Sequence, residues 1–157
     1  MRIFSLLAHL CAILAGLLMT AITLLTCVSL IGRNTTGWTI AGDFELTGVA
    51  TGAAIALFMP LCQLKRGHII VDFFTAKASD GTNALLDRLG ALCVASTFAL
   101  MAWRTVLGGL NAYESFSGTM MLGFPEWVVY AAMVPPFILC SLIALVQTFA
   151  PTEGAPA

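Results

Sequence analysis

The distribution of charged side chains constrains this chain more than any other feature. Seven Lys or Arg and eight Asp or Glu stand among 157 residues, so that 10% of the chain is charged, whereas a soluble domain carries roughly 25%. Most of these charges lie between four apolar stretches, which run over residues 3–31, 46–64, 89–110 and 127–149. A helix needs about 20 apolar residues to cross the hydrocarbon core of a bilayer. The sequence therefore predicts an all-α integral membrane protein with four transmembrane helices.

The apolar stretches favour helices because unpaired backbone groups in lipid are costly, and because the runs are continuous and do not alternate as barrel strands do. The connections between the spans are short, so residues 1–157 are expected to form one membrane domain with a short tail over residues 150–157. The first stretch is longer than the apolar region of a signal peptide, and no A-x-A cleavage site ends it. We therefore expect this first span to be retained.

The positively charged residues predict the orientation of the four spans. Both termini and the middle connection share one side of the membrane, and that side carries five cations: Arg2, Lys65, Arg66, Lys77 and Arg88. The two other connections carry only Arg33. The positive-inside rule then places both termini and the middle connection in the cytoplasm, so that in a Gram-negative cell the two other connections would face the periplasm from the inner membrane. Within the middle connection, residues 72–77 are expected to form a short interfacial helix, with an irregular loop as the alternative.

Composition and side-chain chemistry argue against several functions. A net charge of −1 offers no basic face for nucleic acid. The five cysteines fall inside the predicted spans, their number is odd and no C-x-x-C occurs, which indicates packing residues and no metal site. His9 stands on an apolar helix face and His68 in a connection, whereas a membrane haem needs two facing histidines. We expect no enzyme activity, no cofactor and no metal.

Small residues recur at four-residue spacing within the spans. Such stripes allow two helix backbones to approach closely in a membrane, either within a compact bundle or against another membrane subunit. Both readings stay open. The stripes of the first two spans are Ala8, Ala12, Gly16 and Thr20, followed by Gly48, Gly52 and Ala56.

Two charged residues lie within or next to the predicted spans. Arg104 is the only charge inside a span, and it is expected to reach the interface or to form a structural ion pair, with contact to an anion as the alternative. Glu45 stands at the entrance to the second span, where a salt bridge to Arg33 or to a partner is expected.

The run from Gln63 to Asp72, with the sequence QLKRGHIIVD, resembles a known signature. It is similar to the R-x-G-H-[IV]-x-V-D segment of the small membrane subunit of tripartite ATP-independent periplasmic (TRAP) transporters, the DctQ-like family. Arg33 after the first span and the Glu45-Leu46 pair at the start of the second fit the same pattern. Residues 117–130 resemble its S-x-x-L-x-[IL]-P-x-W-x-x-Y segment. The chain departs from the family at Asn34, where an aromatic residue is common, and in the spacing of Asp43 and Glu45.

The resemblance implies a non-catalytic subunit that pairs with a large multi-span transporter subunit and helps dock a periplasmic solute-binding protein. The transporter would take up an organic acid, such as a C4-dicarboxylate or sialic acid, by symport with sodium or protons. In this interpretation Gly67 permits a tight exit from the second helix where a side chain would clash, and Lys65 and Arg66 contact anionic lipid headgroups. Asp72 would pair with Arg66 or cap the interfacial helix. The alternative is that these residues merely solvate a loop.

The candidate structural or partner-contact residues share positions at span ends or in the motifs: Arg33, Glu45, Arg66, Gly67, His68, Asp72, Arg104, Pro125 and Trp127. Besides the large subunit and the binding protein, membrane lipids are expected partners. Two other functions stay open. A self-sufficient small four-helix exporter would want an embedded carboxylate in the first span, which has none. A membrane anchor subunit of a redox enzyme would be recognised by bound haem.

Overall fold

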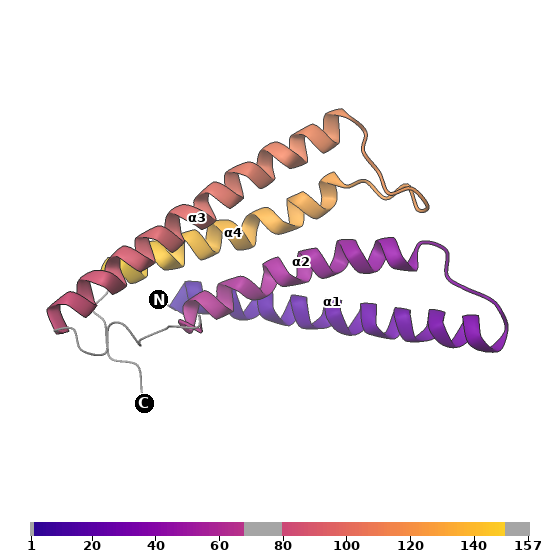
Figure 1. Ribbon diagram of the computed structural model, residues 1–157, viewed down its shortest axis with the longest axis horizontal. Helices are drawn as coiled ribbons and strands as arrows, with labels where there is room; N and C mark the ends of the chain where they lie inside the picture. The colour runs from indigo at the N-terminus through magenta and orange to yellow at the C-terminus, as the bar shows by residue number, and fades with distance from the viewer. Residues whose placement is uncertain (1, 68–79, 150–157) are drawn as a thin grey trace.

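Four long helices make up the described part of the chain. The computed structural model describes residues 2–67 and 80–149. Its helices are α1 (Arg2–Thr35), α2 (Asp43–Leu64), α3 (Asp80–Glu114) and α4 (Trp127–Phe149), as Figure 1 shows. Each is long and apolar enough to cross a membrane. In these two ranges there is no strand, only one isolated bridge between Gly118 and Pro125. The prediction of an all-helical protein with four candidate membrane spans is confirmed, while the segment expected as an interfacial helix and the tail lie outside the described residues.

Two helices are longer than the apolar stretches that predicted them. α1 has 34 residues and α3 has 35, which at about 1.5 Å per residue gives roughly 50 Å each, compared with a hydrocarbon core of about 30 Å. α3 begins at Asp80, nine residues before the predicted start of the span. Charged residues such as Asp87 and Arg88 mark the edge of the apolar run, but they do not end a helix, since charged side chains are compatible with helical backbone. The ends of α1 and α3 therefore extend past the core, or the helices tilt.

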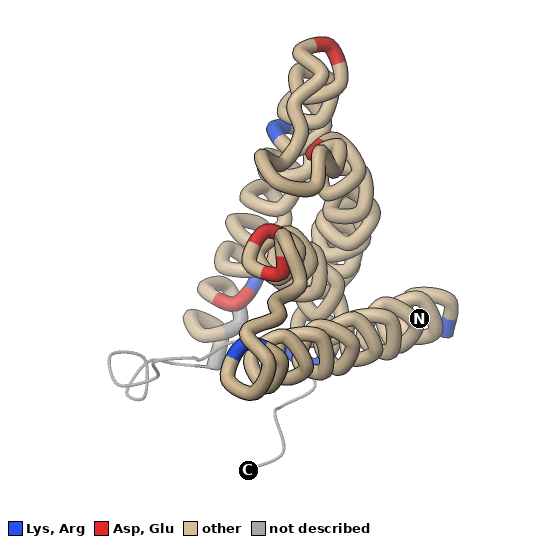
Figure 2. Tube along the Cα trace, turned by 90° about the vertical axis from the view of Figure 1, so that its right-hand side faces the viewer, with Lys and Arg blue, Asp and Glu red and all other residues tan. Residues whose placement is uncertain are grey.

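The helices form two hairpins that pack together through α2 and α4. α1 packs against α2, α3 packs against α4, and α2 packs against α4, while α1 makes only slight contact with α4. Figure 1 shows the two hairpins close together where the termini lie and diverging toward their connecting loops. We call the end with residues 36–42 and 115–126 the loop end, and the opposite end the terminal end. In Figure 2, viewed from the loop end, α1 runs sideways from the other helices toward its N-terminus.

A small apolar core lies between α2, α3 and α4. Its buried members are Ala56, Phe98, Ala102, Phe137 and Cys140. The rings of Phe98 and Phe137 lie 6.3 Å apart between centroids, so α3 and α4 meet through an aromatic contact of the kind that stabilises helix pairs. Alanine on α2 and α3 leaves room for these rings. α4 thus occupies the centre of the assembly.

The buried seam of α1 follows a seven-residue spacing. Its four buried residues are Ala8, Ala15, Ile22 and Ser29, a repeat typical of helices that cross at a small angle. Of the expected stripe with four-residue spacing only Ala8 belongs to this seam, because a spacing of four drifts around the helix over several turns, and contact of the stripe with another subunit stays a prediction. In α2, Gly48 is exposed, and a Cβ atom on Gly48 or Gly52 would have no described atom within 4 Å. The third member of the expected stripe, Ala56, is 1% exposed and belongs to the core with α3 and α4.

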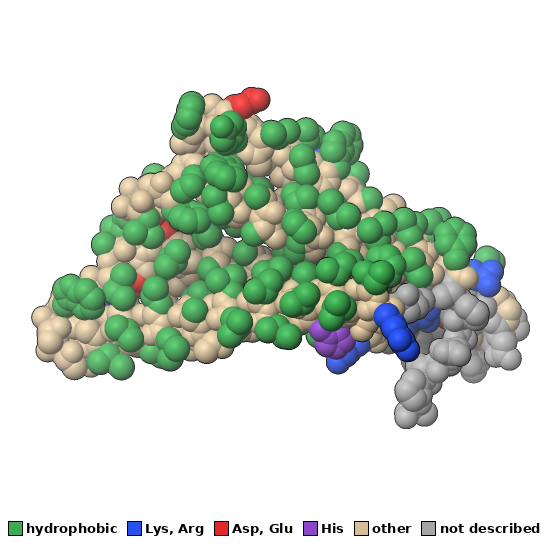
Figure 3. Space-filling model, turned by 180° about the vertical axis from the view of Figure 1, so that it is seen from behind, with side chains coloured by type: hydrophobic (Ala, Val, Ile, Leu, Met, Phe, Trp, Pro, Cys, Tyr) green, Lys and Arg blue, Asp and Glu red, His purple; other side chains and the backbone are tan. Residues whose placement is uncertain are grey.

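The exterior of the protein is largely apolar. Large apolar side chains are exposed along all four helices, among them Leu17 at 64%, Leu100 at 57% and Ile138 at 46%. Figure 3 shows them spread across one whole face, with the basic side chains and the histidine gathered at one end. A monomeric soluble protein rarely exposes so much continuous apolar surface. The surface fits a chain surrounded by lipid and by other membrane helices.

Candidate functional site

The polar side chains that meet in this structure join helices to one another. In the two described ranges no group of three His, Cys, Asp or Glu side chains is placed to hold a metal ion. Four polar contacts between described residues are considered in turn, and each links a different pair of structural elements. These contacts hold the helices of the two hairpins together, and the other helix surfaces stay exposed.

The first contact joins the start of α2 to the connection between α3 and α4. The Glu45 carboxylate accepts hydrogen bonds from the backbone N–H of Met121 (2.9 Å to Oε1 and 3.1 Å to Oε2) and of Leu122 (3.2 Å to Oε2). Gly42, with φ +78°, lies directly against Leu122, because a Cβ atom on Gly42 would stand 2.5 Å from Leu122 Cγ. We call Gly42, Glu45, Met121 and Leu122 the clasp. It is the only one of the four contacts at which the two connecting loops meet.

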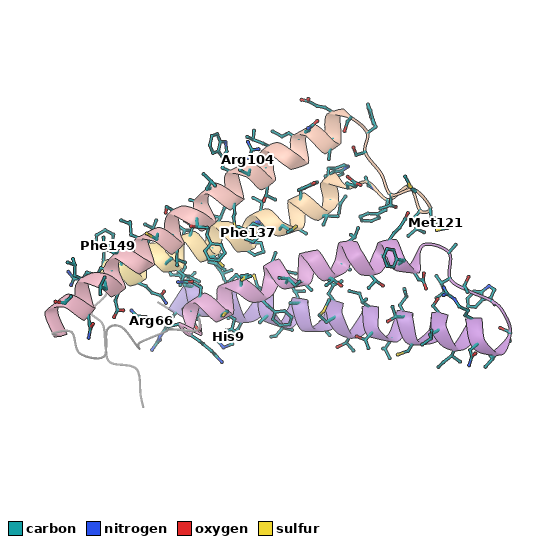
Figure 4. The ribbon with its side chains drawn as sticks, viewed as in Figure 1. His9, Arg66, Arg104, Met121, Phe137 and Phe149 are labelled. Atoms are coloured by element: carbon teal, nitrogen blue, oxygen red, sulfur yellow. The ribbon has the colours of Figure 1, made fainter. Side chains whose placement is uncertain are left out.

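The connection at residues 115–126 has a fixed local structure that presents these N–H groups. Thr119 N–H donates to Phe124 O (3.0 Å), Glu126 N–H donates to Ser117 O (3.1 Å), and Gly123 N–H donates to Thr119 O (2.9 Å). Gly123 takes a φ of +61°, which favours glycine. The motif residues between Ser117 and Pro125 therefore build a compact turn. The turn holds Met121 at its tip, as Figure 4 shows.

Pro125 and Trp127 lie at the base of this turn. Pro125 forms the bridge with Gly118 and precedes α4. The Trp127 ring packs edge-to-face against Tyr113 at 5.9 Å between centroids, which links the first turn of α4 to the last turn of α3. The structure thus brings Glu45, Pro125 and Trp127 to one end of the molecule, where the two hairpins are joined.

The second contact joins α1 to α2. The Ser29 hydroxyl, with only 1% of the residue exposed, donates to Asp43 Oδ2 at 2.5 Å. Arg33 lies one turn beyond Ser29 and is exposed. No ion pair between Arg33 and Glu45 is present among the described residues, so the expectation that Glu45 pairs with Arg33 is wrong, while a salt bridge from Glu45 to a partner stays a prediction. Glu45 instead reaches the backbone of the α3–α4 connection, which sequence spacing alone does not bring near.

The third and fourth contacts lie inside the apolar helices. Gln63 Nε2 donates to Gln147 Oε1 (2.8 Å), and Gln147 Nε2 donates to the backbone O of Gln63 (2.9 Å), which ties α2 to α4. Ser141 Oγ donates to the backbone O of Ala95 (3.0 Å) and ties α4 to α3. Between transmembrane helices such bonds are worth on average about 0.6 kcal/mol. Their main effect is to fix which faces meet.

The charge pattern does not identify these residues, which link one helix to another. Ser29, Gln63, Ser141 and Gln147 are uncharged polar residues inside stretches that contain no Asp, Glu, Lys or Arg. A polar side chain in lipid needs an internal partner. An isolated Ser or Gln in such a stretch was therefore the available signal.

At the terminal end, the exit from α2 differs from the expectation. Arg66 adopts a left-handed φ of +50°. Arg66 N–H donates to Gln63 O (3.1 Å) and Gly67 N–H donates to Cys62 O (3.0 Å), the bond pair of a Schellman cap. A Cβ atom on Gly67 would stand 3.5 Å from Cys62 Sγ, which is ordinary contact. The expected clash at Gly67 is therefore wrong: the constrained position is Arg66. His68 and Asp72 lie outside the described residues.

Arg104 stands apart from the other candidate residues. It is exposed on α3, and the helix continues past it to Glu114. Its side chain points away from α4 (Figure 4), and in the described ranges it forms no ion pair. The long aliphatic part of an arginine can lie along lipid while the guanidinium reaches polar headgroups.

The chain is similar to a known family over most of its length. A family model described as "Tripartite ATP-independent periplasmic transporters, DctQ component" matches residues 22–153 of the 157. No curated protein and no solved structure gave a significant match. The matched range includes Ser29, every residue of the clasp and the last three helices. This chain therefore belongs to the DctQ family, the small membrane component of TRAP transporters.

Proposed function

We propose that the chain is the non-catalytic scaffold of its transporter. It would hold the large multi-span subunit in the membrane and help dock the solute-binding protein during ion-coupled uptake of an organic acid. The observation that supports this proposal is that polar side chains within the helices bond other parts of the same chain. Ser29, Gln147 and Ser141 each bond another part of the same chain, whereas an ion or solute site needs converging polar groups that face a ligand.

The exposed apolar faces support the scaffold role. A Cβ atom on Gly48 or Gly52 of α2 would meet no described atom within 4 Å, and small residues of this kind let a second backbone approach closely. Such a face suits a helix of the large subunit. The hairpins meet mainly through α2 and α4, so α1 and α3 retain long lateral surfaces for further contacts.

Copurification of the chain with the large subunit tests the proposed scaffold role. When the chain is coexpressed with the large subunit of its transporter, affinity purification of a tagged chain should recover both proteins in equal amounts. Widening the exposed face of α2 with Gly52→Leu should reduce recovery of the large subunit, since a leucine prevents close approach. The same change should leave the isolated chain folded, because a Cβ atom there meets nothing within 4 Å. Equal recovery with Gly52→Leu would count against contact through this face.

We also propose that the terminal end faces the cytoplasm and the loop end faces the periplasm, with the protein in the bacterial inner membrane. The distribution of charge supports this orientation: Arg2, Lys65, Arg66 and Arg88 belong to the terminal half, whereas Asp43, Glu45, Glu114 and Glu126 belong to the loop end. The bias of Lys and Arg is the part of this pattern that sets topology.

Labelling of introduced cysteines tests the orientation. Thr39 and Lys65 are both exposed, at opposite ends. In intact spheroplasts, a membrane-impermeant maleimide should modify Thr39→Cys above the level of the unsubstituted chain, and Lys65→Cys only after the membrane is permeabilised. The reverse pattern would show that the proposed orientation is inverted.

A further inference from the structure

An open pocket lies at the terminal end, where the first turns of α1 meet the end of α2. It is lined by Arg2, Ser5, Leu6 and His9 of α1 and by Leu64 of α2, and its volume is about 540 Å³. That volume falls in the usual range for small-ligand sites, roughly 300–1,000 Å³. Figure 3 shows basic side chains beside the histidine at this end of the molecule. None of the clasp residues lines this pocket, and neither do the helix-linking residues Ser29, Gln63, Ser141 and Gln147.

The four lining residues of α1 share one helix face, since their positions differ by three, four and seven. Arg2 supplies a planar fork of donors that suits a phosphate. His9 Nδ1 lies 2.7 Å from the carbonyl oxygen of Ser5, so the hydrogen on Nδ1 is used within the helix. His9 Nε2 is then the acceptor left for a hydroxyl group of a ligand. The pocket therefore combines a cation suited to a phosphate with a second polar contact about two turns away.

The surroundings are apolar on the side that continues along α1. Leu6 is 64% exposed and Leu10 is 49% exposed, and Ile13 continues the same apolar surface at 60%. Lys65 and Arg66, both exposed, follow directly after Leu64. Figure 4 places Arg66 and His9 at the same end of the molecule. A ligand that fits has an anionic head and an apolar tail.

We propose that this pocket binds one anionic phospholipid, with its phosphodiester on Arg2, its polar headgroup on His9 Nε2 and its acyl chains along Leu6 and the following turns of α1. A soluble phosphate ester fits less well, because it would leave the apolar lining of Leu6 and Leu64 in water. The site lies at residues 2–9 of α1, outside the range 22–153 that matches the family model. It does not depend on which solute the transporter carries.

Lipid retention by the full-length chain tests the proposal. The chain is placed in phosphatidylcholine nanodiscs that contain phosphatidylglycerol, and native mass spectrometry then measures the phosphatidylglycerol that stays bound. The chain should retain phosphatidylglycerol in preference to phosphatidylcholine. Arg2→Gln should lower the retained amount about fivefold, the effect of one cation near a headgroup. His9→Leu should lower it about threefold, the effect of one hydrogen bond.

Matched variants separate this site from general charge and from misfolding. Arg2→Lys keeps the cation and should keep the lipid, while Arg33→Gln removes a cation at the opposite end and should change nothing. Soluble glycerol phosphate at millimolar concentration should not displace the lipid. Unchanged retention in Arg2→Gln and His9→Leu, equal retention of the two lipids, or displacement by glycerol phosphate would each overturn the proposal.

Discussion

Replacing Gly42 with alanine is expected to destabilise the protein by about 3 kcal/mol. Gly42 has a φ of +78°, where a side chain costs roughly 1–2 kcal/mol. Its new Cβ atom would also stand 2.5 Å from Leu122 Cγ, and overpacking of this kind costs about 1–3 kcal/mol. Thermal unfolding of the purified chain in detergent should show a Tm lower by about 6–12 °C, as expected for a chain of this length.

Two further variants separate the two causes. Gly37 has a φ of +70°, but a Cβ atom there would meet nothing within 4 Å, so Gly37→Ala carries only the backbone cost. In the double variant Gly42→Ala/Leu122→Ala the overlapping side chain is shortened. The stability lost through Gly42→Ala in that background should then fall toward that of Gly37→Ala. If Gly42→Ala alone costs no more than Gly37→Ala, the two connecting loops do not meet as described.

Removing the Glu45 carboxylate is expected to release the connection at residues 115–126. The carboxylate is the acceptor for Met121 N–H and Leu122 N–H, and a bond from an N–H to a charged acceptor is stronger than a neutral one. In Glu45→Ala, hydrogen exchange at these two amides should become faster by about tenfold or more, as local opening no longer has to break the bonds. Glu45→Gln keeps one acceptor oxygen, so its exchange rates should fall between those of Glu45→Ala and the unsubstituted chain.

Glu114→Ala is the matched control for Glu45. Glu114 is also a carboxylate at the loop end, but it is exposed, and its side chain makes no hydrogen bond or ion pair with the described residues. Its removal should leave exchange at Met121 and Leu122 unchanged. Equal acceleration by both substitutions would mean that net charge at the loop end, and not the clasp, protects these amides. Because the clasp joins the hairpins, Glu45→Ala should also weaken retention of the large subunit.

The charge pattern predicted the four helices because the bilayer imposes a length of apolar sequence on every span. The prediction was less accurate for features that the bilayer does not constrain, such as the ends of helices in water and the spacing of a contact between helices. α3 begins at Asp80 although the apolar run begins at Leu89, since a helix can continue into water. The stripe on α1 was predicted with a spacing of four, whereas the seam follows a spacing of seven through Ala15 and Ile22. That spacing depends on the angle at which α1 crosses α2. The sequence of α1 alone does not determine this angle.

The candidate site was predicted in part, and the reason differs from residue to residue. Glu45 was recognised as a residue that needs a partner, but its partners are backbone N–H groups 76 and 77 residues away, and no side-chain type reveals such a partner. Arg66 was grouped with the loop cations, although its left-handed φ is a property of the backbone cap. Gln147 carries no charge, so the charge pattern does not single it out, although its position in an apolar helix requires a hydrogen-bond partner.

Reconstituted uptake tests the central claim most directly. Proteoliposomes with an imposed sodium or proton gradient should contain the large subunit alone, this chain alone, or both, each with the solute-binding protein outside. A panel of labelled organic acids, including a C4-dicarboxylate and sialic acid, then reports uptake. The scaffold account predicts uptake only when both membrane subunits are present. Uptake by this chain without the large subunit would contradict it, because the chain would then hold a solute site of its own.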